Sequence, residues 1–118
     1  MTPLRTTTRD SPTGPVLHII GELDYTTAPD LRDLIATLTV QPGALLVLDL
    51  ARMEFCDSSG ISVLIAARNQ VQAARADIAL AAVPAHTLRI LRIIGLDQVF
   101  RLLPGTEPGS PGICTEVP

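Results

Sequence analysis

The chain contains 118 residues, of which 47% are hydrophobic and 3% aromatic, and it carries a formal net charge of −3. This length is sufficient for one hydrophobic core and short for two domains. An acidic chain with so few aromatic rings offers neither a basic surface for phosphates nor platforms for bases, which excludes direct nucleic-acid binding. All basic residues are arginines, and the absence of lysine excludes Schiff-base chemistry and a phosphate-loop lysine.

The cysteines and the N-terminal segment indicate the cellular compartment. Cys56 and Cys114 are far apart, and neither has a second Cys or a His at a metal-ligand spacing. We therefore expect reduced thiols, no metal and no cofactor. Residues 1–10 lack the apolar core of a signal peptide, and no apolar stretch approaches the roughly 18 residues that a membrane span requires. The sequence predicts a cytoplasmic protein without a membrane partner.

The first half of the chain alternates between strand and helix patterns. Residues 16–22 are rich in β-branched and apolar side chains and follow a turn at 11–15, which predicts a strand. The polar segment 5–9 is suited to pair with it as an antiparallel edge strand. Over 28–39 apolar residues recur at helical spacing, and two threonines before them are suited to cap an amphipathic helix.

The second half begins with a continuous apolar run at 44–50. A strand without alternation is covered on both faces, which is typical of a central strand in a parallel sheet. Further elements are predicted as a helix at 59–74, a strand at 78–83, a helix at 86–94 that Gly95 ends, and a short strand at 99–102.

This alternation predicts an α/β fold with right-handed crossovers, in which a mostly parallel sheet of four to five strands packs with three or four helices. We assign residues 1–103 to one domain. Residues 104–118 contain four prolines and three glycines without periodicity, which predicts a flexible C-terminal tail.

One polar motif stands between the central strand and the second helix: Asp57-Ser58-Ser59-Gly60. In open α/β sheets, ligands and partners meet such strand-to-helix edges. The first three residues of the motif are all good N-cap residues, so plain helix capping explains the motif in isolation. Residues 51–56 are expected to form the loop that leads into it, with Arg52 and Glu54 as solvated residues or rim contacts.

The functional alternative is phosphorylation of Ser58. A phosphoserine at a helix N-terminus is tolerated because free backbone N–H groups and the helix dipole favour its charge. A partner lying over Ser58 would instead meet added volume and charge next to Asp57. Gly60, which has no Cβ, is expected to leave room for another backbone to approach the hydroxyl. Cys56 is expected to be a small packing residue rather than a redox sensor.

Four motifs follow one another between about residues 16 and 100. They are Gly21-Glu22-Leu23-Asp24 followed by Thr27-Ala28, Leu48-Asp49-Leu50, Phe55-Cys56-Asp57-Ser58-Ser59-Gly60-Ile61, and Ile94-Gly95-Leu96-Asp97-Gln98-Val99-Phe100. Together they resemble the motifs of STAS domains, and among these the bacterial anti-sigma factor antagonists. The specificity of the resemblance lies in the order and spacing of the motifs.

The resemblance implies a STAS-like sandwich and a phosphorylation switch. In that family the unphosphorylated antagonist binds an anti-sigma factor that is also a serine kinase, which frees a sigma factor, and phosphorylation then breaks the pairing. The phosphorylated residue corresponds to Ser58, and a metal-dependent serine phosphatase restores the active form. The partner-binding residues implied around it are Asp24, Asp57, Ser59, Gly60 and Ile61, of which Asp24 is equally suited to a turn ahead of the first helix.

The sequence lacks residues that the enzymatic alternatives require. Asp24, Asp49 and Asp57 resemble the acidic cluster of a Mg²⁺-binding receiver domain, but that family also requires a lysine. A hydrolase using Ser58 needs a nucleophile elbow and a base, while the only histidines, His18 and His86, are placed mid-strand and at a helix start. We therefore expect a binding protein rather than an enzyme.

A second alternative keeps the fold and changes the task. STAS domains also serve anion transporters, stress-sensing assemblies and lipid-trafficking complexes. A stand-alone STAS subunit of such an assembly would not need phosphorylation of Ser58.

Overall fold

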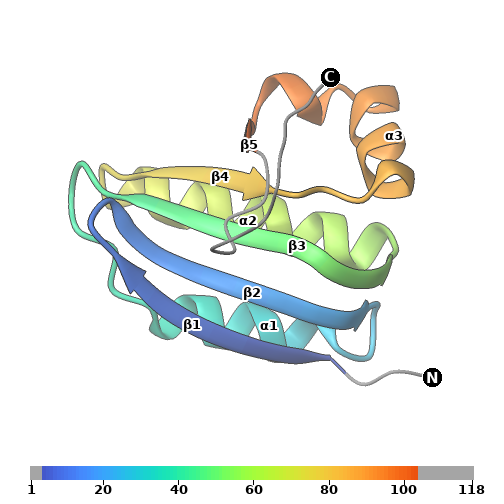
Figure 1. The fold of residues 1–118 in the computed structure, drawn as a ribbon, viewed down its shortest axis with the longest axis horizontal. Helices are drawn as coiled ribbons and strands as arrows, with labels where there is room; N and C mark the ends of the chain where they lie inside the picture. The colour runs from blue at the N-terminus through green and yellow to red at the C-terminus, as the bar shows by residue number, and fades with distance from the viewer. Residues whose placement is uncertain (1–3, 104–118) are drawn as a thin grey trace.

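The computed structural model describes residues 4–103 as one five-stranded sheet with helices between its strands (Figure 1). The strands follow one another across the sheet in chain order. β1 pairs antiparallel with β2, whereas all other neighbouring strands are parallel. The elements are β1 (Arg5–Ser11), β2 (Gly14–Leu23), α1 (Ala28–Thr37), β3 (Leu45–Cys56), α2 (Ser58–Ala73), β4 (Asp77–Ala81), α3 (Ala85–Ile93), the 3₁₀-helix η1 (Leu96–Gln98) and β5 (Arg101–Leu103). The predicted α/β class, mostly parallel sheet and antiparallel first strand are confirmed.

Both α1 and α2 lie on one side of the sheet, behind the strands in Figure 1. Right-handed crossovers between sequentially ordered parallel strands require this, because each connecting helix must pack on the same face. The main core fills the space between that face and the helices. Its largest fully buried side chains are Leu17, Ile19, Leu23, Leu31, Leu46, Leu48, Leu50, Leu64, Ile78, Leu80, Leu91 and Val63.

The opposite face of the sheet carries a second, smaller cluster of buried residues. Val16, Val47, Ala79 and Ala81 belong to it, and Leu45 and Leu103 pack against it. Successive side chains of β3 therefore project alternately toward this face and toward the helix-covered face. We refer to it below as the open face.

The expectation of a loop at 51–56 is wrong, because β3 continues to Cys56 and pairs with β2 along this stretch. The pairing contains two register shifts, and each inserts one extra residue into β3 relative to β2. Met53 and Cys56 are therefore buried three positions apart instead of two. Such β-bulges interrupt the strand period, which explains why the sequence pattern appears irregular here. Arg52 and Glu54 accordingly lie on β3.

The remaining boundaries agree with expectation to within a few residues. Gly95 has φ +82°, the left-handed conformation of a residue that ends a helix, as predicted for the end of α3. The last strand begins two residues later than predicted, because residues 96–98 form η1 and Phe100 turns into the core. The predicted tail, 104–118, lies outside the described residues.

Candidate functional site

Asp57 is the N-cap of α2. It has an extended backbone, and its Oδ1 accepts hydrogen bonds from the N–H groups of Ser59 at 2.8 Å and Gly60 at 3.1 Å. Two of the unpaired N–H groups at the helix start are thereby satisfied. Of the three capping candidates in the motif, the first one performs the capping.

Ser58 is consequently the first residue of α2, and its side chain has no part in the cap. The residue is exposed, and nothing in residues 4–103 hydrogen-bonds its hydroxyl. Only its carbonyl oxygen is engaged within the helix start, where it accepts from the hydroxyl of Ser62 at 3.0 Å. The hydroxyl is therefore available for chemistry without the loss of a described native contact.

Gly60 and Ile61 point into the protein. Both are buried, since they lie on the side of α2 that faces the sheet. A Cβ built on Gly60 would lie 2.7 Å from Sγ of Cys56 and 2.8 Å from Cγ of Leu23. The missing Cβ serves internal packing, so the expectation that it leaves room for another backbone is wrong. The part that these two residues play in partner binding stays a prediction, and their burial favours an indirect, supporting role.

The ends of β2 and β3 are joined next to the motif. Leu23 is in register with Cys56, and the N–H of Asp57 donates to the carbonyl oxygen of Leu23 at 3.2 Å. Asp24 and Asp57 thus leave neighbouring strands at the same edge of the sheet. The structure brings together the two sequence motifs that lie more than thirty residues apart in the chain.

Asp24 organises the turn before α1. Its Oδ1 accepts from the hydroxyl of Thr26 at 2.6 Å and from the N–H groups of Thr26 at 2.9 Å and Thr27 at 3.1 Å. These hydrogen bonds, above all the one from the Thr26 hydroxyl, lower the pKa of Asp24 below its usual value of 3.8. The turn interpretation of Asp24 is therefore confirmed, and its contact with a partner stays a prediction.

Thr27 occupies the N-cap position of α1, but its hydroxyl does not cap the helix. The hydroxyl instead donates to the carbonyl oxygen of Glu22 at 2.9 Å and accepts from the N–H of Asp24. Thr27 thus holds the predicted N-cap position, but it makes no side-chain cap, because its hydroxyl bonds back to the end of β2.

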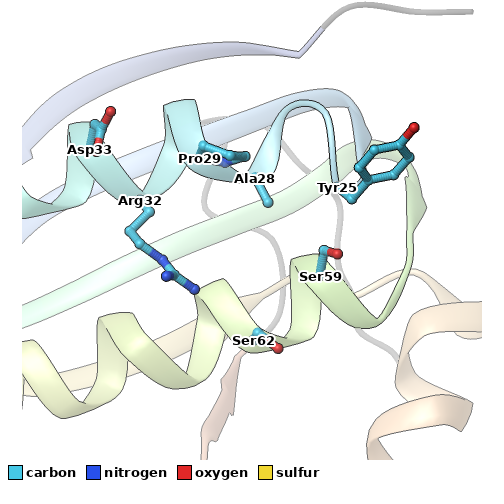
Figure 2. Close-up of a pocket in the computed structure, with 7 residues that line it drawn as sticks. All are labelled: Tyr25, Ala28, Pro29, Arg32, Asp33, Ser59 and Ser62. Atoms are coloured by element: carbon cyan, nitrogen blue, oxygen red, sulfur yellow. The ribbon is translucent and has the colours of Figure 1, made fainter.

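A groove of about 350 Å³ lies beside the motif (Figure 2). Ser59 and Ser62 of α2 form one wall, α1 forms the other, and the side chain of Arg32 extends from α1 toward α2. Tyr25, with 74% of its surface exposed, stands at the end of the groove. The complete lining is Tyr25, Ala28, Pro29, Arg32, Asp33, Ser59 and Ser62.

Two exposed aromatic side chains lie near the motif, and the sequence predicted a partner contact for neither of them. Tyr25 follows Asp24, and Phe55, which is 46% exposed, lies at the end of β3. A signal was present, since the chain has only one Tyr and two Phe, and an aromatic residue in a turn has no need of core packing. Arg32 was also missed, because its place opposite α2 depends on helix packing.

Cys56 is buried beneath the motif. Burial, together with the nearby charge of Asp57, raises the pKa of its thiol to about 12. Because the thiolate is the reactive form, this environment favours packing over redox chemistry, as the sequence suggested. Cys114 lies outside the described residues.

The carboxylates and histidines considered for catalysis do not form one cluster. Asp49 lies within β3 on the open face, where its Oδ2 is 3.6 Å from Nδ1 of His18, while Asp24 and Asp57 serve a turn and a cap. Within residues 4–103 no three His, Cys, Asp or Glu side chains group in a way that could hold a metal ion. No helix of this part of the chain is long and apolar enough to cross a membrane.

Comparisons with known proteins agree with this architecture. Residues 6–104 match the family model described as Mlab, STAS domain. The chain is 31% identical over 98 residues to the anti-sigma-F factor antagonist RsfB of Mycobacterium tuberculosis, covering 83% of this chain and 80% of RsfB. A crystal structure of an anti-sigma factor antagonist from Mycobacterium paratuberculosis superposes with a TM-score of 0.74 at 29% identity, covering 85% of each chain.

The fold extends to a more distant protein. The phosphorylated form of the Bacillus cell fate determinant SpoIIAA aligns with a TM-score of 0.63 at 21% identity, over 91% of this chain and 93% of SpoIIAA. The fold, the order of the motifs and the extent of the matches all indicate the same family. The chain belongs to the STAS domain family and, within it, to the anti-sigma factor antagonists.

Proposed function

We propose that this protein is an anti-sigma factor antagonist switched by phosphorylation. In its unphosphorylated form it binds an anti-sigma factor with serine kinase activity in the cytoplasm, which frees a sigma factor. Transfer of a phosphoryl group to Ser58 breaks the complex, and a serine phosphatase restores binding. The role as a regulatory binding protein is supported by the names of its relatives.

The observation that carries this proposal is that Asp57, and not Ser58, caps α2. Asp57 caps α2, so the exposed hydroxyl of Ser58 is not needed for the helix. A phosphate there would add roughly 1.5 to 2 negative charges near the positive end of the helix dipole, a placement that helices tolerate. The fold is therefore expected to survive the modification.

The surface around Ser58 supports the binding half of the proposal. Its neighbour Ser59 lines the groove that ends at Tyr25, and Phe55 is exposed at the end of the preceding strand. Aromatic side chains are enriched among residues that dominate binding energies. A phosphate on Ser58 would bring charge and volume next to these contacts and to the acidic Asp57. We infer that Tyr25, Asp24, Asp57 and Ser59 contribute to the partner surface, and that Gly60 and Ile61 support it from inside.

A binding experiment with three variants tests the switch. Ser58→Ala, Ser58→Asp and the control Thr39→Ala, an exposed hydroxyl residue after α1, are each mixed with the cognate anti-sigma kinase and ATP, and complexes are followed by size-exclusion chromatography. We expect Ser58→Ala to remain bound, Ser58→Asp to bind weakly, and Thr39→Ala to bind and then be released like the wild type. Equal behaviour of the two Ser58 variants would contradict the switch. Thermal melts of all three establish that folding is retained.

The reverse step has its own test. Phosphorylated protein treated with the cognate metal-dependent serine phosphatase should regain binding to the kinase in parallel with phosphate release. Dephosphorylation without recovery of binding would contradict the proposed role of the phosphate.

A second candidate is a STAS subunit of another assembly, such as a lipid-trafficking or stress-sensing complex. The observation in its favour is that the matching family model bears the name Mlab, which differs from the names of the antagonist relatives. Such a subunit would bind its assembly equally well with Ser58 or Ser58→Asp. Insensitivity of the isolated native complex to this substitution would favour the second candidate over the first.

A further inference from the structure

The open face of the sheet carries a polar cavity away from the groove between α1 and α2. Its volume is about 270 Å³, and it is lined by side chains from three adjacent strands, β1, β2 and β3. The proposed phosphorylation switch makes no use of it. The polar lining residues are Arg5, Thr7, His18, Asp49 and Arg52.

Strand register explains how these residues meet. Arg5 is paired with Ile20, and Ile20 with Arg52, which forms one row across three strands. Thr7, His18 and Asp49 form the next row in the same way. Directly paired residues project from the same face of a sheet, and neighbouring strands are about 4.8 Å apart. The two arginines therefore flank Ile20 from either side, about 10 Å apart at their backbones.

A β-bulge brings Arg52 to this face. Between the His18–Asp49 and Ile20–Arg52 pairs, β3 advances three residues while β2 advances two. Without the extra residue, Arg52 would face the helices, since side chains alternate along a regular strand. The N–H of Ala51 donates to Oδ1 of Asp49 at 2.9 Å within the bulge. Asp49, only 2% exposed, thus stabilises the β-bulge that places Arg52 at the cavity.

The charges of the lining favour an anion. Asp49 is the single carboxylate among the lining residues, and its Oδ2 lies 3.6 Å from Nδ1 of His18. The two guanidinium groups of the lining therefore outnumber its one carboxylate. The guanidinium groups of Arg5 and Arg52 have no ion-pair partner in residues 4–103. Guanidinium groups match the geometry of phosphate oxygens and hydrogen-bond them in pairs.

We propose that this cavity binds a small polyvalent oxyanion of the phosphate class between Arg5 and Arg52, with the Thr7 hydroxyl as a further donor. The hydrophobic side chain of Ile20 forms the floor on which the anion rests. The site is independent of the phosphorylation switch, because it lies on the other face of the sheet from α2.

Titration calorimetry with inorganic pyrophosphate tests the proposal in buffer free of other polyvalent anions. Wild-type protein should show saturable binding, and orthophosphate should bind more weakly than pyrophosphate. Arg5→Gln and Arg52→Gln should each weaken binding about tenfold or more, the loss expected on removal of a charge-assisted contact. The matched control is Arg89→Gln, an exposed arginine on α3, which should leave the affinity unchanged.

Two results would overturn the site. One is a lack of saturable pyrophosphate binding by the wild type, and the other is an equal loss for Arg89→Gln, which would indicate only general charge attraction. Amide NMR gives a second readout, since pyrophosphate should shift the resonances of Thr7 and His18 and leave those of α3 in place. Ser58→Asp should bind pyrophosphate like the wild type, so failure of the switch and failure of this site are distinguishable.

Discussion

The segments that follow β2 and β3 have similar chemistry and different consequences. Each begins with an aspartate whose carboxylate accepts backbone N–H groups, and each contains two Ser or Thr residues, which follow Tyr25 in the first segment and follow the aspartate directly in the second. After Asp24, the hydroxyls of Thr26 and Thr27 are both bonded inside the turn. After Asp57, the hydroxyl of Ser58 has no such bond with the described residues. The hydroxyls of the first segment are therefore used within its turn, whereas the exposed hydroxyl that the proposed switch requires is found in the second segment.

The two segments also contact each other through packing and a backbone hydrogen bond. Leu23, just before the first segment, packs where Gly60 of the second lacks a side chain, and its carbonyl oxygen binds the N–H of Asp57. The first segment thus acts as a support for the second. Substitutions at Gly60, Asp57 and Asp24 test these supporting contacts separately from the exposed hydroxyl of Ser58.

The largest effect is expected from Gly60→Ala. The Cβ of alanine would overlap Cys56 and Leu23, and overpacking costs about 1–3 kcal/mol. The helix preference of alanine over glycine, about 1 kcal/mol, applies to helix interiors and offsets little of this cost, because Gly60 lies in the first turn of α2. We expect a net loss of unfolding free energy in urea melts, with Ser62→Ala on the exposed side of α2 within about 0.5 kcal/mol of the wild type. Adding Leu23→Ala should reduce the penalty of Gly60→Ala. A stabilised Gly60→Ala protein would show that the contact is absent.

A smaller effect is expected from Asp57→Ala. Loss of an N-cap acceptor costs about 0.5–2 kcal/mol, because the N–H groups of Ser59 and Gly60 lose their partner. Asp57→Asn, which keeps a side-chain oxygen, should recover part of the loss in thermal melts. Ser59→Ala is the matched control. If it lost as much stability as Asp57→Ala, the assignment of Asp57 as the cap would be contradicted.

The smallest effect concerns Asp24 and depends on pH. Its pKa in the folded protein lies below the usual 3.8, so its ionised form stabilises the fold above that value. This contribution is lost as the pH falls through the folded pKa. Wild-type protein should therefore exceed Asp24→Asn in urea midpoint at pH 7, and the difference should vanish toward pH 2. A difference that is constant with pH would contradict the role of the charge in the turn.

The sequence was most informative where one physical effect dominates. Continuous apolar runs and helical spacing predicted the buried strands and α2, and the capping preference of aspartate anticipated Asp57. The bulged stretch at 51–56 could not be found this way, because its extra residues break the period of two. The orientation of Gly60 was misjudged, since its contact with Leu23 joins segments far apart in the chain. The row of Arg5, Ile20 and Arg52 depends on strand register, which no local pattern encodes.

Mapping the phosphate shows whether Ser58 is the residue that the kinase modifies. The wild type, Ser58→Ala and the matched control Ser62→Ala are incubated with the cognate anti-sigma kinase and ATP, then measured by intact-mass and phosphopeptide mass spectrometry. We expect one phosphate on Ser58 in the wild type and in Ser62→Ala, and none in Ser58→Ala. A phosphate on Ser59 or Ser62 instead, or unchanged incorporation into Ser58→Ala, would contradict the assignment of Ser58 as the released hydroxyl.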